Sequence, residues 1–119
     1  MKKTLVLGAS TNPARYAYKA VNRLVAHGHD VVALGIKKGR IGNVEIVQGL
    51  PDIKGLHTIS LYLNPSRQKE YYNYLLQLQP QRIIFNPGTE NPVLMKMAKE
   101  KNIEVIAACT LVMLSIGNY

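Results

Sequence analysis

Short apolar runs alternate with amphipathic helical patterns along the whole chain, and this alternation constrains the fold more than any other feature. The runs are too short for buried helices and are typical of strands that a parallel sheet buries on both faces. Strands and helices joined by tight connections predict a three-layer α/β fold, with helices on both faces of a mostly parallel sheet of about five strands. The expected strands are residues 4–7, 31–34, 57–63, 82–85 and 104–107, with a short extra strand at 44–47.

The segments between these runs carry the signals that begin and end helices. The first helical pattern ends at Gly28, because glycine supplies the left-handed residue that terminates a helix. Ser66 can cap a second helix, which Pro80 closes. Asn91 caps a third helix, which has proline in its first turn, and Thr110 begins a short terminal helix.

Length and charge limit the classes of function. A chain of 119 residues fits one domain, residues 1–119, and no apolar run is long enough to cross a bilayer. No segment resembles a secretion signal, so we expect a cytoplasmic protein with no membrane partner. The net charge of +8 indicates an anionic partner, and nine of the fifteen Lys and Arg residues lie in residues 1–60. A basic surface that only maintains solubility explains the charge equally well.

The sequence predicts no metal site and no catalytic residue. A single cysteine, Cys109, excludes an internal disulfide and cannot alone form a thiolate zinc site, and an inert buried thiol is its commoner role. The histidines at positions 27, 29 and 57 fall at the amino ends of the expected strands and share no spacing of a metal site or a triad. The chain is therefore expected to bind rather than to catalyse.

The loops that follow the strands form the candidate site, because open parallel sheets bind ligands beyond the carboxyl ends of their strands. The first of these loops lacks the G-x-G-x-x-G pattern of dinucleotide-binding turns. It still offers a sharp turn, short polar side chains, N–H groups at a helix start and an arginine, which together suit a phosphate. The candidate residues are Gly8, Ser10, Thr11, Asn12, Pro13 and Arg15. The structural alternative is a helix cap beside a solvated arginine.

The second loop, residues 35–43, discriminates between cofactors. A site for NAD requires an acid at the end of the second strand, but Gly35 stands there and is followed by Lys37, Lys38 and Arg40. A carboxylate would repel a phosphate on the ribose, whereas these cations attract one. The loop therefore favours a ligand with a ribose phosphate, as in NADP and coenzyme A, although a mobile basic hairpin remains the structural alternative.

The later loops give weaker signals. Leu63, Asn64 and Pro65 can form an apolar wall for adenine or only a turn with a helix cap. Residues 86–92 bend at Gly88, and Glu90 can act as an acid or base or only complement the helix start.

Several motifs resemble those of the stand-alone CoA-binding-domain proteins, which are similar to the N-terminal domain of the succinyl-CoA synthetase alpha subunit. These motifs are GAS-TNP-R-Y after the first strand, the H-G-H turn, KKG after the second strand, RIIFNPGTEN and ACTLVML. The resemblance covers nearly the whole chain and implies a Rossmann-like fold with coenzyme A lying across the strand ends. The family often has a proline-containing segment after the second strand, where this chain has residues 35–37.

By this resemblance the first loop would surround the pyrophosphate and Lys38 would lie near the 3′-phosphoadenosine, with Lys37 beside it. Leu63, Asn64 and Pro65 would border the adenosine, and the next loop would lie near the pantetheine. The residues implied in that next loop are Asn86, Pro87 and Gly88. The ligase domain that carries the phosphorylated histidine of the synthetase has no counterpart here, so the resemblance implies binding of coenzyme A or an acyl-CoA without catalysis.

Two alternative functions stay open, and so does the oligomeric state. An NADP-binding, reductase-like protein would share the basic second loop, and a regulatory or nucleic-acid-binding protein would share the positive charge. We rank nucleic acid last, because no aromatic platform or reading helix is evident. The apolar residues 111–116 could pack on a second subunit and make a homo-oligomer.

Overall fold

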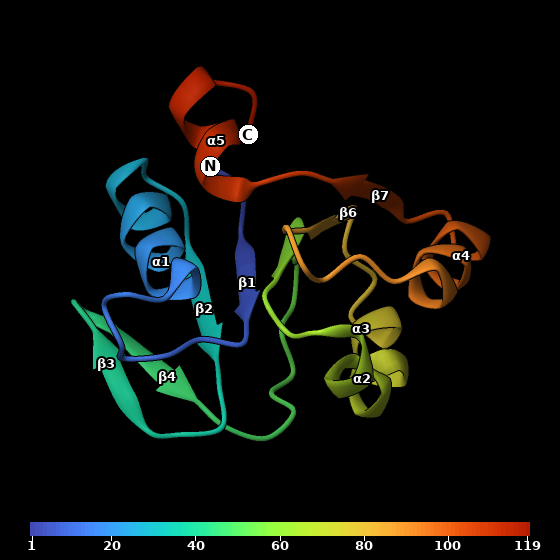
Figure 1. Ribbon diagram of the computed structural model, residues 1–119, viewed down its shortest axis with the longest axis horizontal. Coiled ribbons are helices and arrows are strands. Elements are labelled where there is room, and N and C mark those ends of the chain that lie inside the picture. The colour runs from blue at the N-terminus through green and yellow to red at the C-terminus, as the bar shows by residue number, and fades with distance from the viewer.

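Seven strands form one sheet in the order β3-β4-β2-β1-β5-β6-β7 (Figure 1). The computed structural model describes residues 1–119. The strands are β1 (Thr4–Leu7), β2 (Val31–Leu34), β3 (Gly39–Ile41), β4 (Val44–Val47), β5 (Thr58–Leu61), β6 (Arg82–Phe85) and β7 (Glu104–Ala107). All neighbouring strands are parallel except β3 and β4, which form an antiparallel hairpin. The predicted α/β, Rossmann-like fold with a mostly parallel sheet is confirmed.

The sheet has more strands than the five that the sequence indicated. Residues 35–43 were expected to be a loop, but residues 39–41 form β3 and pair with β4. The turn between them is tight, with Gly42 at φ +59°, and Arg40 lies opposite Glu45 across the hairpin. A three-residue strand with an arginine at its centre carries too little apolar pattern to be detected in the sequence.

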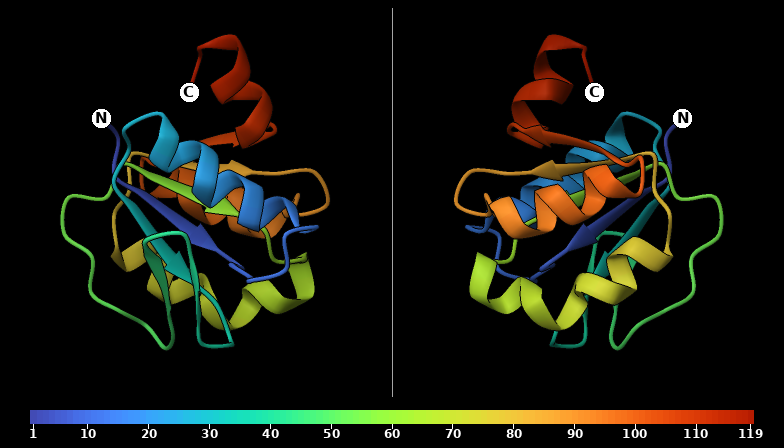
Figure 2. Two further views of the ribbon diagram at one scale, coloured as in Figure 1. Left: turned by 90° about the vertical axis from the view of Figure 1, so that its left-hand side faces the viewer. Right: turned by 90° about the vertical axis from the view of Figure 1, so that its right-hand side faces the viewer.

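The helices are α1 (Tyr16–Ala26), α2 (Pro65–Gln68), α3 (Tyr72–Gln77), α4 (Pro92–Glu100) and α5 (Thr110–Ile116), and the 3₁₀ turn η1 (Lys69–Tyr71) joins α2 to α3. Two hydrophobic cores, one on each face of the sheet, assign these helices to two layers. One core lies under α1 and α5 and contains Val6 and Ile84; the other lies under α3 and α4 and contains Leu5 and Phe85. Neighbouring residues of β1 and of β6 thus point to opposite faces, so both faces are covered, as the two side views in Figure 2 show. No helix is both long and apolar enough to span a bilayer.

The helix starts follow a repeated Asn-Pro pattern. Asn91 accepts hydrogen bonds from the first N–H groups of α4, and Pro92 follows it, as predicted. The cap of α2 is Asn64 and not Ser66, because the Asn64 side chain accepts from the Arg67 N–H, and Pro65 takes the first helical position. The expectation for Ser66 was wrong by two residues, although the Asn-Pro pair that begins α4 is also present at the start of α2.

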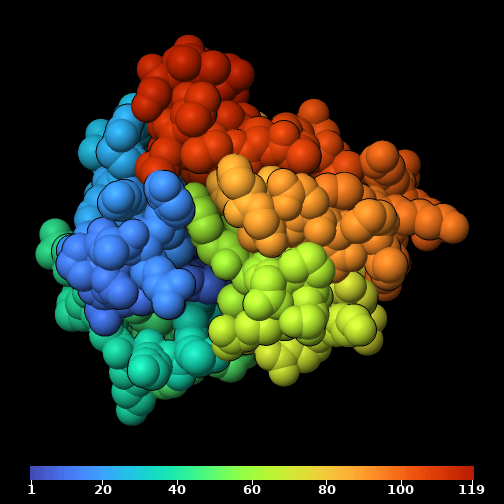
Figure 3. All heavy atoms as spheres, viewed as in Figure 1, coloured from blue at the N-terminus to red at the C-terminus, as the bar shows by residue number.

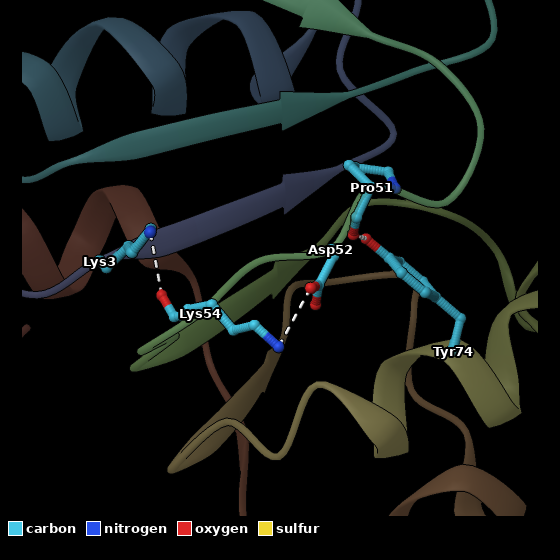
Figure 4. Close-up of polar contacts among 5 residues, drawn as sticks. All are labelled: Lys3, Pro51, Asp52, Lys54 and Tyr74. Carbon is cyan, nitrogen blue, oxygen red and sulfur yellow. Dashed lines mark hydrogen bonds and ion pairs between the residues drawn. The ribbon is translucent and has the colours of Figure 1, made fainter.

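The long connection from β4 to β5 runs along one face of the sheet, from the carboxyl end of β4 to the amino end of β5, and side-chain contacts fix it at several points (Figure 4). The Tyr74 hydroxyl of α3 donates a hydrogen bond to the carbonyl of Pro51. Lys3 donates from Nζ to the carbonyl of Lys54 at 2.9 Å, and the Lys54 ammonium lies 3.1 Å from the Asp52 carboxylate. Ile53 and Leu56 of the connection belong to the core under α3 and α4, so the connection lies on the face of the sheet away from α1.

Basic groups gather at the amino ends of the strands around Tyr119. The Arg82 side chain is buried, and its Nε donates to Thr58 Oγ1 at 2.8 Å. Its guanidinium carbon lies 4.5 Å from the centroid of the Tyr119 ring. Lys2 Nζ and Arg82 Nη2 both donate to the main-chain oxygen of Tyr119, at 2.7 and 3.1 Å. The two ends of the chain thus meet at the edge of the sheet opposite the loops after β1 and β2 (Figure 1).

This basic cluster makes the stability of the fold sensitive to acid. Burial, followed by nearby positive charges, lowers the pKa of His29 and of His57 below the usual 6.5. In the range where an unfolded histidine takes up a proton, the folded protein resists protonation, so the unfolded state binds more protons. The stabilisation is complete above pH 6.5 and is lost as the pH falls below that value.

We therefore expect the melting temperature of the ligand-free protein to decrease as the pH is lowered from about 7 to about 5.5 in thermal melts. The variant His29→Gln/His57→Gln should show a flatter profile over the same range. His27 is exposed and is only one of several positive charges that lower the pKa of His29, so His27→Gln should flatten the profile less than the double variant does. A wild-type melting temperature that rises on acidification would contradict the assignment.

Candidate functional site

A pocket of about 440 Å³ lies at the carboxyl ends of the strands, where four loops converge. β1 lies at the centre of the sheet, with β2 beside it on one side and β5 on the other. The strand order therefore reverses at β1, and the pocket lies over this point. On the face seen in Figure 3 the first loop, the start of α2 and the loop before α4 meet. The lining residues come from positions 7–17, 34–37, 62–71 and 87–89. The loops after β1, β2, β5 and β6 therefore lie together as expected, whereas residues 108–110, the loop after β7, do not line the pocket.

The first loop contributes Gly8, Ser10, Thr11 and Arg15 to the pocket, while Asn12 and Pro13 do not line it. Gly8 has φ +101°, a conformation that glycine adopts without strain. The N–H groups of Gly8 and of its neighbour both bond to Leu34 O, at 2.9 and 3.0 Å, so they fix the loop to β2 and are not available to a ligand. Asn12 stabilises the turn, because its Oδ1 accepts from the Ala14 N–H.

The helix that follows this loop begins without a cap. Arg15 occupies the N-cap position of α1, and no side chain accepts a hydrogen bond from the first helical N–H groups. By contrast, asparagine side chains cap both α2 and α4. Tyr16 and Ala17, the first two residues of α1, line the pocket. Unpaired N–H groups and the positive end of the helix dipole therefore lie at the pocket.

The second loop approaches the first very closely. A Cβ atom on Gly35 would collide with the carbonyl oxygen of Ala9, and one on Gly39 would collide with the side chain of Thr11. Gly35, Ile36 and Lys37 line the pocket.

The other two cations of this loop do not line the pocket. Lys38 is exposed outside it. Arg40 belongs to the hairpin, where it donates to Asn43 O at 3.1 Å and lies 3.8 Å from the Glu45 carboxylate. Of the three cations that the sequence grouped together, the structure brings only Lys37 to the pocket.

Leu63 lines the pocket after β5, whereas Asn64 and Pro65 build the start of α2 and do not line it. After β6, Pro87 lines the pocket, but Asn86 and Gly88 do not. The Gly88 N–H donates to Glu90 Oε1 at 2.8 Å. Glu90 therefore has a structural contact within its own loop.

The buried side chain of Asn86 makes contacts only within the fold. Its Nδ2 donates to Ser60 Oγ at 3.0 Å and to Leu61 O at 2.9 Å, and its Oδ1 accepts from the Thr110 N–H at 2.8 Å. Ser60 and Thr110 also share a hydrogen bond of 2.7 Å. Asn86 thus connects β5 and β6 to the start of α5.

Sequence reasoning missed several lining residues. Tyr62, Arg67, Tyr71 and Thr89 all line the pocket. Arg67 and Tyr71 follow the Asn-Pro helix start and are four residues apart, so they are expected on the same side of a helix. This spacing was the signal in the sequence that could have identified them. The Tyr62 hydroxyl is buried without a hydrogen-bond partner, and burial raises the pKa of Tyr62 to about 12. Tyr62 is therefore neutral at physiological pH.

The electrostatic character of the pocket is uniformly positive. Arg15, Lys37 and Arg67 line it, and no carboxylate does. All three side chains are exposed and form no ion pair with the protein. The histidines and the rest of the basic cluster lie at the opposite edge of the sheet, and nowhere do three His, Cys, Asp or Glu side chains gather as a metal site. The pocket is suited to a ligand with several negative charges.

Comparisons with known proteins identify relatives of this chain. A family model described as "CoA binding domain" matches residues 2–115. A solved structure of an uncharacterized protein is 50% identical with a TM-score of 0.97, and 100% of this chain and 98% of that chain are covered. A protein of Thermus thermophilus is 25% identical with a TM-score of 0.86, covering 99% and 90%. A hypothetical protein from Pyrococcus horikoshii shares the fold at 24% identity, with a TM-score of 0.88 and coverage of 97% and 82%. No curated protein matches the chain.

Proposed function

Because this chain belongs to the CoA-binding-domain family, we propose that it binds coenzyme A or an acyl-CoA in the pocket at the carboxyl ends of β1, β2 and β5. The observation that carries the proposal is the uncapped start of α1, which meets a pocket lined by three cations and no acid. A coenzyme with about four negative charges supplies the anions that such a site lacks.

The pyrophosphate would lie at the first loop. The first N–H groups of α1 have no acceptor within the protein, and the exposed side chain of Arg15 lines the same pocket. Backbone N–H groups at a helix start and an arginine fork are both strong partners for phosphate oxygens. Ser10 and Thr11 line the same wall and add short side-chain donors.

The adenosine would lie between the second and third loops. Ile36 and Leu63 line the pocket from the two sides and supply apolar contacts for a base. Lys37 is the cation of the second loop that lines the pocket, so it takes the role at the 3′-phosphate for which the sequence also suggested Lys38. The pantetheine would then extend toward Pro87 and Thr89, which line the pocket from the loop after β6.

The proposal is binding without catalysis. The pocket contains no carboxylate and no histidine, and Tyr62 holds its proton at physiological pH. A carrier or sensor of coenzyme A needs no further group. An NADP-binding protein remains the alternative, since NADP also carries a ribose phosphate.

Calorimetric titration with CoA, dephospho-CoA and NADPH under one buffer condition tests the proposal. We expect CoA to bind at least about tenfold more tightly than dephospho-CoA, because one charged hydrogen bond contributes about 1.5–3 kcal/mol. NADPH should bind more weakly than CoA. Equal affinities for CoA and dephospho-CoA would remove the role of Lys37, and tighter binding of NADPH would favour the alternative.

A further inference from the structure

The arginines of this protein fall into two groups according to their partners. Arg23, Arg40 and Arg82 each donate a side-chain hydrogen bond to the protein, to Ser115 Oγ, Asn43 O and Thr58 Oγ1 respectively. Arg15 and Arg67 donate none, and these two are the arginines that line the pocket. The proposed function assigns Arg15 to the pyrophosphate. It assigns no role to Arg67, whose guanidinium also lines the pocket and donates no hydrogen bond to the protein.

The backbone under Arg67 is held firmly. Its N–H donates to the cap residue Asn64, at 3.0 Å to Oδ1 and 3.1 Å to the carbonyl oxygen. The next residue, Gln68, is fully buried, and its Nε2 donates to Leu63 O and to Thr89 O, both at 2.8 Å. The start of α2 is thus bound to two walls of the pocket. A side chain that needs little ordering of its main chain binds a ligand at low entropic cost.

Arg67 and Lys37 approach the pocket from opposite sides. Lys37 follows β2 and Arg67 follows β5, and these strands are the two neighbours of β1 in the sheet. The apolar side chains of Ile36, Leu63 and Tyr71 also line the pocket, and they come from the same two sides. A base in contact with these apolar groups would share the pocket with both cations, which line it beside them.

The charge of the ligand indicates which phosphate suits two cations. Each phosphorus of a pyrophosphate diester carries one negative charge, whereas a phosphate monoester approaches two at neutral pH because its second pKa is about 6. In coenzyme A the monoester is the 3′-phosphate of the ribose. An ammonium and a guanidinium from opposite walls match this dianion.

We propose that Arg67 is a specificity residue that binds the ribose 3′-phosphate together with Lys37. This inference rests on the proposed binding of coenzyme A. Arg67 then contributes to the discrimination between CoA and dephospho-CoA, and the pyrophosphate depends on Arg15 and the start of α1.

The test is calorimetric titration of Arg67→Gln with CoA and with dephospho-CoA. We expect the affinity for CoA to fall about tenfold and the affinity for dephospho-CoA to stay within about twofold. Lys69→Gln is the matched control, because Lys69 is exposed on the same helical segment and does not line the pocket. It removes one positive charge and should change neither affinity.

The outcomes separate the inference from the function on which it rests. If the wild-type protein binds no CoA, the proposed function fails and this inference fails with it. If the wild type binds CoA and Arg67→Gln binds it equally well, only the role of Arg67 is overturned. An equal loss for both ligands would also overturn it, because Arg67 would then contact a group that the two ligands share.

Discussion

Replacing Arg15 and Lys37 together with glutamine should weaken CoA binding by about 100-fold or more, because two charged hydrogen bonds of about 1.5 kcal/mol each are lost. Both side chains are exposed, line the pocket and form no ion pair with the protein. The melting temperature of the ligand-free variant should therefore stay close to that of the wild type, since exposed substitutions usually change stability by less than about 0.5 kcal/mol. Calorimetric titration and thermal melts measure the two quantities.

The variant Lys19→Gln/Lys38→Gln is the matched control for this prediction. Lys19 lies on α1 with its ammonium 5.3 Å from the centroid of the Tyr16 ring, and Lys38 follows Lys37 directly. Neither lines the pocket, yet their removal lowers the net charge by the same amount. If the control loses as much affinity as the double pocket variant, the general positive field and not direct contact explains the binding.

Replacing Asn86 with leucine should lower the free energy of unfolding by about 3 kcal/mol, because a buried N–H or C=O group left unpaired costs about 1–3 kcal/mol. The substitution removes the acceptor of the Thr110 N–H and the donor to both Ser60 and Leu61. In a domain of this size such a loss lowers the melting temperature by roughly 10 °C or more. Chemical denaturation and thermal melts of the ligand-free protein check the value.

Asn73→Leu is the comparison for this variant. Asn73 lies on α3, is exposed and forms no side-chain hydrogen bond. Its replacement should change the free energy of unfolding by less than about 0.5 kcal/mol. Equal stabilities of the two variants would show that the hydrogen bonds of Asn86 contribute little to the fold.

Most of the architecture could be predicted because each element has a local signal. Residues 4–7, 31–34, 82–85 and 104–107 are strands with the expected bounds, since each is a short and mostly apolar run. The last of them, β7, is an edge strand and is only partly buried. The hairpin strand β3 could not be detected in the same way. It is an edge strand, and its pairing depends on the turn at Gly42 and on its partner β4.

The candidate site was predicted by position more reliably than by residue. The loops after β1, β2, β5 and β6 all line the pocket, because the carboxyl ends of parallel strands lie at the same edge of a sheet. Which polar side chain faces a ligand depends on partners distant in the sequence. Asn86 and Asn64 have the residue type of a binding site, but their side chains bond to the protein itself.

The cations show the same limit. The sequence indicates that Lys37, Lys38 and Arg40 lie close together, but successive residues of an extended chain point in different directions. Arg40 pairs with Glu45 across the hairpin, which no local pattern reveals. Arg67 was missed because it was expected to lie inside the helix capped by Ser66, beyond the loop that was assigned to the site.

The close contact between Gly35 and the carbonyl of Ala9 has a consequence for attempts to change the ligand. Engineering a protein to accept NAD commonly means installing an acid at the end of the second strand, where it can bond the ribose hydroxyls. In this scaffold an aspartate or glutamate at position 35 would push aside the turn at which we propose the pyrophosphate lies. Such a redesign would have to rebuild the backbone of both loops, because one substitution cannot supply the acid and keep the turn.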